Sequence, residues 1–194
     1  CVLRIFFFFF FDTDERASNL TTSQTIMLHQ APLAKYSNAY FLHLMSLLSR
    51  KTVRWTEMVP AQKLLHNFEE TSRRHFPDPN ADSPLCLQIA ASSAQDAEAA
   101  IKVALSQRPA LFCSVNLNLG CPASTADSGS YGAFLLQDIP RLIETARGVV
   151  SGCSSFGVPA TAKLRTGIHG ESSYEHLSKL VAALHQVGMR EIVL

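Results

Sequence analysis

The segment PLCLQIAASSAQDAEAAIKVALSQRPALFCSVNLNLG, from Pro84 to Gly120, contains the pattern that decides the fold. Its apolar run over 84–90 predicts a buried strand, and its alanine-rich run over 93–107 predicts a helix with one polar face. A second apolar run over 114–120 predicts another strand. A strand, a helix and a strand in this order predict two parallel strands joined by a crossover helix.

The same alternation extends in both directions from this unit. Further strands are predicted over 25–33, 52–59, 159–167 and in the C-terminal EIVL, and further helices over 38–49, 60–68, 139–152 and 173–188. A doubly wound sheet is one alternative, but no G-x-G-x-x-G follows the first strand. We therefore predict an α/β fold of the (β/α)8 TIM-barrel type. Because such a barrel takes about 250 residues, this chain is expected to be cut short after about six strands.

Composition, net charge and cysteine spacing limit the classes of protein to which this chain can belong. The 194 residues are 47% hydrophobic and 17% charged, with a formal net charge of +1, so no strongly basic field points to a nucleic-acid partner. The five cysteines form no C-x-x-C pair and no zinc-like spacing; they are Cys1, Cys86, Cys113, Cys121 and Cys153. We expect no metal site and a reducing, cytoplasmic compartment, with a mitochondrion or plastid left open.

The first residues, CVLRIFFFFFF, lack an initiating Met and contain six consecutive Phe. A membrane span needs about 18 or more apolar residues, so this run is too short and no membrane association is expected. The following DTDERASNL offers no clear A-x-A cleavage site, although a targeting segment stays an alternative. We expect a fragment or a misplaced gene start. Residues 1–24 are left unassigned as a low-complexity segment, and residues 25–194 are assigned to one incomplete barrel domain.

Polar side chains stand at the carboxyl ends of the predicted strands, where the active sites of such barrels lie. Burying these groups is costly unless a ligand binds them, so a ligand with many hydrogen-bond acceptors is expected. One of them, Cys121, lies between a glycine and a proline at a strand exit rather than inside an element. The set comprises Pro32, Leu33, Glu57, Gln88, Asn116, Asn118, Cys121, Lys163 and Arg165.

The segment NLNLGCPASTADSGSYGAFLL, residues 116–136, resembles the signature of the tRNA-dihydrouridine synthases, flavoenzymes that reduce uridines in tRNA. The resemblance extends to APLAKYSNAYF (31–41), WTEMVPAQKLLH (55–66), LCLQIAAS (85–92) and ATAKLRTGIHGESSYEHL (160–177). It covers about residues 25–194. The pieces TEMV, LLH and RTGI…SYE are most similar to the branch that acts on U20 and U20a of the D-loop.

This resemblance implies FMN as cofactor, NADPH as reductant and tRNA as substrate. It implies that Cys121 donates the proton to C5 of the uracil, and that Asn118 and Arg165 bind the substrate. The flavin contacts it implies are Pro32, Leu33, Ala34, Gln88 and Lys163. From the residues alone three alternatives stay open, namely an inert buried thiol, an Asn118 that only caps a turn, and an ion pair between Arg165 and Glu57.

Three departures from the family pattern stand out. Leu33 replaces the usual Met, AKYSN (34–38) replaces a more usual acidic or polar stretch, and the chain ends at EIVL where the family continues with His-Ala-Arg. The last barrel strands and a C-terminal helical tRNA-binding domain are therefore expected to be absent. Two other functions stay open. One is an FMN-dependent pyrimidine oxidoreductase of the dihydroorotate dehydrogenase type, and the other is an inactive truncated gene product.

Overall fold

A computed structural model describes residues 7–10, 27–78, 83–122, 131–166 and 173–194. Its main sheet contains the parallel strands β3 (Arg54–Trp55), β5 (Leu85–Ala90), β6 (Ser114–Leu119), β7 (Ala160–Leu164) and β8 (Glu191–Val193), in that order. A short strand, β4 (Val59–Pro60), pairs with the end of β5. Strand β2 (Met27–Gln30) joins the β3 edge of this sheet through a parallel bridge between His29 and Val53.

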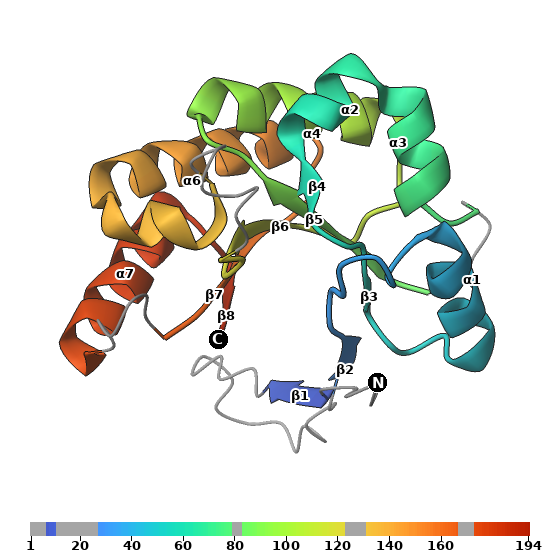
Figure 1. Cartoon of the computed structure of the whole chain (residues 1–194), viewed down its shortest axis with the longest axis horizontal. Coiled ribbons are helices and arrows are strands. Elements are labelled where there is room, and N and C mark those ends of the chain that lie inside the picture. The colour runs from blue at the N-terminus through green and yellow to red at the C-terminus, as the bar shows by residue number, and fades with distance from the viewer. Residues whose placement is uncertain (1–6, 11–26, 79–82, 123–130, 167–172) are drawn as a thin grey trace, which may run out of the picture.

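The sheet curls with its helices on the outside and forms a half-barrel (Figure 1). Each β-α-β connection is parallel, as the alternation in the sequence predicts, because a crossover helix returns the chain to the same end of the sheet. The predicted α/β fold of a truncated TIM barrel is thus confirmed. Buried Leu, Ile, Val and Ala side chains fill the space between sheet and helices, among them Leu87, Ile101, Leu117 and Val149.

The described α-helices are α1 (Ala39–Leu48), α2 (Ala61–His66), α3 (Phe68–His75), α4 (Ala94–Gln107), α6 (Ile139–Ser154) and α7 (Tyr174–Val187). Helices α1, α4, α6 and α7 begin at polar caps that the sequence supplies. The side chains of Asn38, Ser93, Asp138 and Ser173 each accept a hydrogen bond from the backbone N–H three residues later. Such caps satisfy donors that the first helical turn leaves open. At the other end of α7, Gly188 has φ +106, a conformation that favours glycine.

Helices α4 and α6 pack closely because a glycine lies at their contact. A Cβ on Gly148 would lie 2.2 Å from the backbone oxygen of Ala94, a distance that no substituted side chain could accept without backbone movement. Gly152, one turn later on the same face, leaves room for the side chain of Ile101. The two glycines therefore set how tightly this pair of helices covers the sheet.

The structure differs locally from the predicted elements, and the two strand differences have physical causes. The strand predicted over 52–59 is split into β3 and β4, because the backbone N–H of Glu57 donates to Ser37 instead of to a neighbouring strand. The strand predicted over 25–33 ends at Gln30, because the carbonyl of Leu33 closes a turn. Helix α3 and the 3-10 helix η1 (Gly132–Gln137) were not predicted. Strand β1 (Phe7–Phe10), within the unassigned segment, pairs antiparallel with β2.

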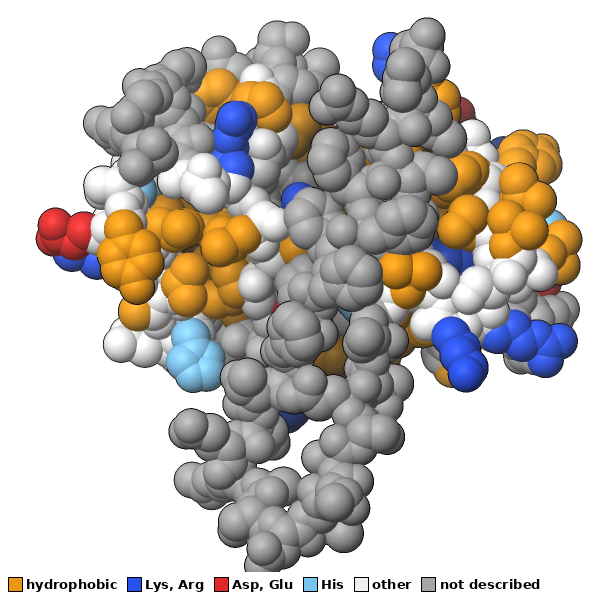
Figure 2. All heavy atoms as spheres, turned by 90° about the horizontal axis from the view of Figure 1, so that it is seen from below, with side chains coloured by type: hydrophobic (Ala, Val, Ile, Leu, Met, Phe, Trp, Pro, Cys, Tyr) orange, Lys and Arg blue, Asp and Glu red, His pale blue; other side chains and the backbone are white. Residues whose placement is uncertain are grey.

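One helix face is notably apolar. Helix α1 exposes Tyr40, Leu44, Leu47 and Leu48, which recur at helical spacing. In the view from below, hydrophobic side chains gather on the side of α1 (Figure 2). Across the described residues, no helix is long and apolar enough to span a membrane.

Candidate active site

A cavity of about 880 Å³ opens at the carboxyl ends of the parallel strands. Its walls come from the β2–α1 loop, from the segment around β4, from α2 and α3, and from the ends of β5, β6 and β7. The polar and sulfur-containing residues that line it are Lys35, Glu57, Met58, Lys63, Arg74, His75, Gln88, Asn118, Cys121, Tyr131, Lys163 and Arg165. The cavity thus lies at the edge of the sheet where the strand-end rule places barrel active sites.

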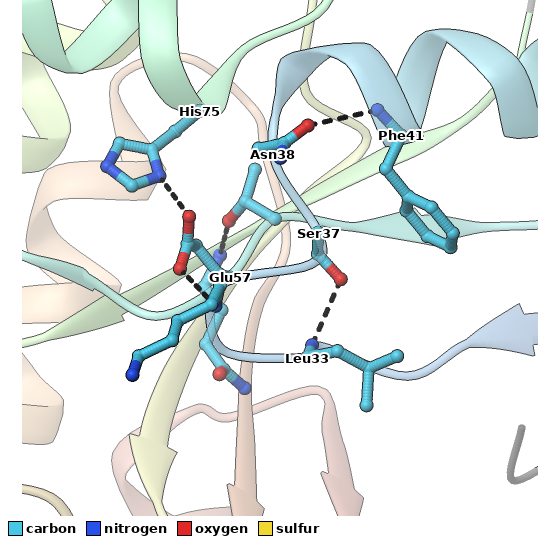
Figure 3. Close-up of polar contacts among 9 residues, drawn as sticks. Leu33, Ser37, Asn38, Phe41, Glu57 and His75 are labelled. Carbon is cyan, nitrogen blue, oxygen red and sulfur yellow. Dashed lines mark hydrogen bonds and ion pairs between the residues drawn. The ribbon is translucent and has the colours of Figure 1, made fainter. Parts of the chain in front are cut away.

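The structure brings most of the predicted site residues to this one cavity. Eight of them line it, namely Pro32, Ala34, Glu57, Gln88, Asn118, Cys121, Lys163 and Arg165. Leu33 belongs to the same loop, but its side chain points away from Glu57 (Figure 3), and it is not among the residues that line the cavity in the described part of the chain. Asn116, also a strand-end candidate, is fully buried.

A row of hydrogen-bonded side chains crosses three neighbouring strands beneath the cavity. Nδ2 of Asn118 donates to Oε1 of Gln88 over 2.9 Å, and the side-chain amides of Gln88 and Asn116 lie 3.0 Å apart. The Asn116 amide in turn lies 2.9 Å from Oγ1 of Thr161 on β7. Gln88 is only 1% exposed. Because buried amides are costly without partners, this row explains how apolar strands tolerate them.

Asn118 also fixes the strand exit that carries the thiol. Its Oδ1 accepts hydrogen bonds from the backbone N–H of Gly120 (3.2 Å) and of Cys121 (3.0 Å). On the other side, the carbonyl of Cys121 accepts one from the N–H of Ala133 in η1 over 3.1 Å. Asn118 therefore does cap a turn, and the turn it caps holds Cys121 at the cavity.

The thiols differ in burial. Cys121 is half-buried and lines the cavity, whereas Cys86 and Cys153 are buried in the core. Burial raises the pKa of the Cys153 thiol to about 12 and the pKa of the Cys86 thiol well above its usual value. The alternative of an inert buried thiol thus fits Cys86 and Cys153, and it does not fit Cys121.

The cavity is predominantly cationic. Among the described lining residues, five are cationic (Lys35, Lys63, Arg74, Lys163 and Arg165) and one, Glu57, carries a carboxylate. Burial lowers the pKa of the Lys163 amine, since desolvation disfavours its charged form. An anionic group bound in the cavity would favour the charged form of this amine, so the walls suit a ligand with negative or acceptor groups.

The carboxylate of Glu57 has other partners than the predicted one. Its Oε2 accepts a hydrogen bond from the backbone N–H of Lys35 over 2.9 Å, and its Oε1 lies 3.1 Å from Nδ1 of His75 (Figure 3). In the described part of the chain, the ion pairs of Glu57 do not include Arg165, whose side chain is exposed. Burial, followed by the charges of Arg74 and Lys63, lowers the pKa of His75, while Glu57 opposes this shift.

Sequence reasoning missed the part of the cavity that α2 and α3 supply. Lys63 lies on α2, and Arg74 and His75 lie in the last turn of α3. The segment FEETSRRH has acidic residues in its first turn and basic residues in its last, which is the charge order that a helix favours. That order was the signal that could have located α3. Among the described residues, no group of three or more His, Cys, Asp or Glu side chains could hold a metal ion.

The sequence of this chain also matches a known protein family. The sequence model of the family described as dihydrouridine synthase (Dus) matches residues 29–194, which include every element that lines the cavity. The chain belongs to the dihydrouridine synthase family. The resemblance seen in the sequence is thereby confirmed.

Curated relatives of this dihydrouridine synthase chain bear the name tRNA-dihydrouridine(20/20a) synthase. The protein of Pseudomonas syringae pv. tomato is 34% identical over 158 residues, which are 81% of this chain and 44% of the relative. That of Pseudomonas putida is 32% identical over 160 residues, 82% of this chain and 45% of the relative. The Synechocystis protein is 29% identical over 83% of this chain and 46% of its own length. The chain spans about half the length of these relatives.

Proposed function

We propose that this chain carries the uridine-reducing site of a tRNA-dihydrouridine(20/20a) synthase that uses FMN and NADPH. The observation that carries the proposal is that Cys121 shares one cavity with Gln88, Asn118 and Lys163. A thiol at a fixed strand exit, beside a partly buried cation, suits a reaction that needs both a proton donor and an anion-binding wall. The relatives' name, tRNA-dihydrouridine(20/20a) synthase, supports tRNA as the class of substrate.

The walls of the cavity suit a flavin. Lys163 is partly buried and gains from a neighbouring negative charge, such as the one that reduced flavin carries. In the proposal, Lys163 and Gln88 hold the flavin ring, together with Pro32, Leu33 and Ala34 of the β2–α1 loop. Leu33 would act through its backbone, since its side chain points away from Glu57 (Figure 3). Bound FMN supplies a hydride for C6 of the uracil.

Cys121 completes the reduction. Adding two hydrogens across the C5–C6 double bond takes one hydride and one proton, and the thiol supplies the proton to C5. A cysteine thiol is mostly protonated at neutral pH, so it can act as an acid there. Asn118 holds the Cys121 turn through Oδ1 and, with Arg165 at the exposed rim, binds the pyrimidine. The target uridine would have to leave its stack to enter the cavity.

The experiment that tests this proposal compares two cysteines at opposite ends of β6. Cys121→Ala is expected to abolish dihydrouridine in the tRNA of a strain whose own gene is deleted and which carries the variant. Cys113→Ala, just before β6 and away from the cavity, is the matched control and should restore dihydrouridine fully. Normal dihydrouridine in the Cys121→Ala strain would reject the proton-donor role. A wild-type gene that fails to restore dihydrouridine would reject the function itself.

A further inference from the structure

The loop that carries Pro32 and Ala34 contains a strained residue. Lys35 has φ +70, a left-handed conformation that residues with a Cβ rarely adopt. The turn around it is closed by hydrogen bonds from the N–H groups of Tyr36 (3.1 Å) and Ser37 (2.9 Å) to the carbonyl of Leu33. Because such a conformation costs free energy, it persists only where the surroundings hold it.

Glu57 holds this turn at two points from the link between β3 and β4. Its Oε2 accepts the hydrogen bond of the Lys35 N–H over 2.9 Å, and its own backbone N–H donates to the carbonyl of Ser37 over 3.2 Å. The Ser37 hydroxyl accepts from the N–H of Leu33 over 3.0 Å (Figure 3). The side chain of Glu57 thus bonds the turn at Lys35, before Tyr36, and its backbone bonds the turn at Ser37, after Tyr36.

His75 in turn orients Glu57. Its Nδ1 lies 3.1 Å from Oε1 of the carboxylate, and both residues are buried, with 4% and 7% of their surface exposed. A buried carboxylate needs partners, and this one has the backbone N–H of Lys35 and the ring of His75, while Lys63 and Arg74 line the same cavity. The end of α3 is therefore connected to the β2–α1 loop through one carboxylate.

We propose that Glu57 is a positioning residue for the cofactor. It anchors the Lys35 turn, so that Pro32 and Ala34 stay at the cavity wall. The inference rests on the proposed function in one respect, namely that the ligand against this wall is the flavin. The anchor itself is a property of the chain without any ligand, so it can be tested separately.

The first test follows the amide hydrogen of Lys35 by hydrogen exchange in the ligand-free chain. Glu57→Ala is expected to remove its protection, whereas Glu57→Gln, which keeps an acceptor oxygen, is expected to retain it. Thr71→Ala is the matched control, because Thr71 is buried on α3 and bonds the carbonyl of Lys63 but not the turn. Undiminished protection of Lys35 in Glu57→Ala would overturn the anchor.

The second test measures the dissociation constant of FMN by flavin fluorescence, well below the unfolding midpoint of each variant. Glu57→Ala is expected to weaken FMN binding about tenfold or more, with rescue in Glu57→Gln and no change in Thr71→Ala. Equal weakening in Glu57→Ala and Thr71→Ala would mean a general loss of stability and would overturn the positioning role. A wild-type chain that binds no FMN, with the exchange result as expected, would instead reject the cofactor assignment.

A pair of substitutions at position 35 sharpens the test. Lys35→Ala and Lys35→Gly both remove the ammonium group, but only glycine adopts a positive φ without strain. Adding Glu57→Ala should therefore weaken FMN binding by a larger factor in the alanine background than in the glycine background. Equal factors in the two backgrounds would show that Glu57 does not act through the Lys35 backbone.

Discussion

Asn118 and Cys121 are joined by a hydrogen bond of 3.0 Å from the backbone N–H of the cysteine to the side-chain oxygen of the asparagine. The same asparagine donates to Gln88, so one side chain connects the buried amide row to the thiol turn. Asn118→Ala is expected to destabilise the fold by about 1–3 kcal/mol, because a buried amide of Gln88 loses its partner. Urea denaturation would measure this loss.

Asn118→Asp separates the two roles of that residue. It keeps an acceptor for the N–H groups of Gly120 and Cys121, but it removes the donor to Gln88. We expect its stability to lie between those of the wild type and Asn118→Ala, because only the bond to Gln88 is lost. Equal stability of Asn118→Asp and the wild type would show that the bond to Gln88 contributes nothing.

Thiol alkylation should distinguish the cysteines in the native protein. Cys121 is half-buried in the cavity and should react, whereas Cys86 and Cys153 should react only after unfolding, because burial raises the pKa of both thiols. Mass spectrometry of alkylated peptides would measure the rates. FMN is expected to slow the labelling of Cys121 and to leave that of exposed Cys113 unchanged; equal slowing of both would place the flavin elsewhere.

Two adjacent arginines at the end of α3 offer a test of the nucleic-acid surface. Arg74 lines the cavity, whereas Arg73 is exposed on the same helix and is not among the lining residues in the described part of the chain. If the proposed tRNA phosphates contact Arg74, Arg74→Ala should reduce the slope of log K against log salt by about 1. Arg73→Ala should leave the slope unchanged. Equal slopes for the two variants would remove Arg74 from the tRNA interface.

The buried His75 should make stability depend on pH. Its pKa in the folded state is lowered from 6.5, so the unfolded chain binds more protons between the two pKa values. The free energy of unfolding should therefore rise as the pH increases from below the folded-state pKa to about 6.5. His75→Gln should flatten this rise, as measured by urea denaturation at about pH 5.5 and pH 7.5. Because the pKa of His29 is also lowered, only the difference between variant and wild type is informative.

Close packing of α4 and α6 gives a prediction away from the site. Gly148→Ala should destabilise the fold by about 1–3 kcal/mol, because its Cβ would collide with backbone at Ala94 and no rotamer change can relieve that. Gly157→Ala is a useful comparison, since nothing lies within 4 Å of its Cβ position and its cost arises only from its positive φ. A stable Gly148→Ala variant would mean that the helices can separate freely.

The sequence predicts the fold well where its periodicity is strong. The strand, helix and strand over 84–120 appear within a residue or two of the predicted bounds, because the alternation of buried runs and polar faces follows from packing alone. The segment around Glu57 is different. Its strand is interrupted by a hydrogen bond to Ser37, a residue 20 positions away whose location depends on the finished fold.

The candidate site likewise contains residues that could be placed from the sequence and residues that could not. Cys121 and Lys163 could be placed together from the sequence, because the carboxyl ends of parallel strands meet at one edge. Lys63 and His75 could not, because their place at the cavity depends on how α2 and α3 pack on α4, on α1 and on each other. The ion pair between Arg165 and Glu57, an alternative that the sequence leaves open, is not among the ion pairs of the described residues, since charge alone does not say which residue comes within reach.

The amide row from Thr161 through Asn116 to Gln88 has a consequence for how the barrel strands align. A slip of one residue between β5, β6 or β7 would turn every side chain to the opposite face and break each of these bonds at once. The contacts that support the thiol therefore also select the correct strand alignment during folding. A substitution at Thr161, which is not among the described residues that line the cavity, should alter the position of Cys121 through the three intervening amides of Asn116, Gln88 and Asn118.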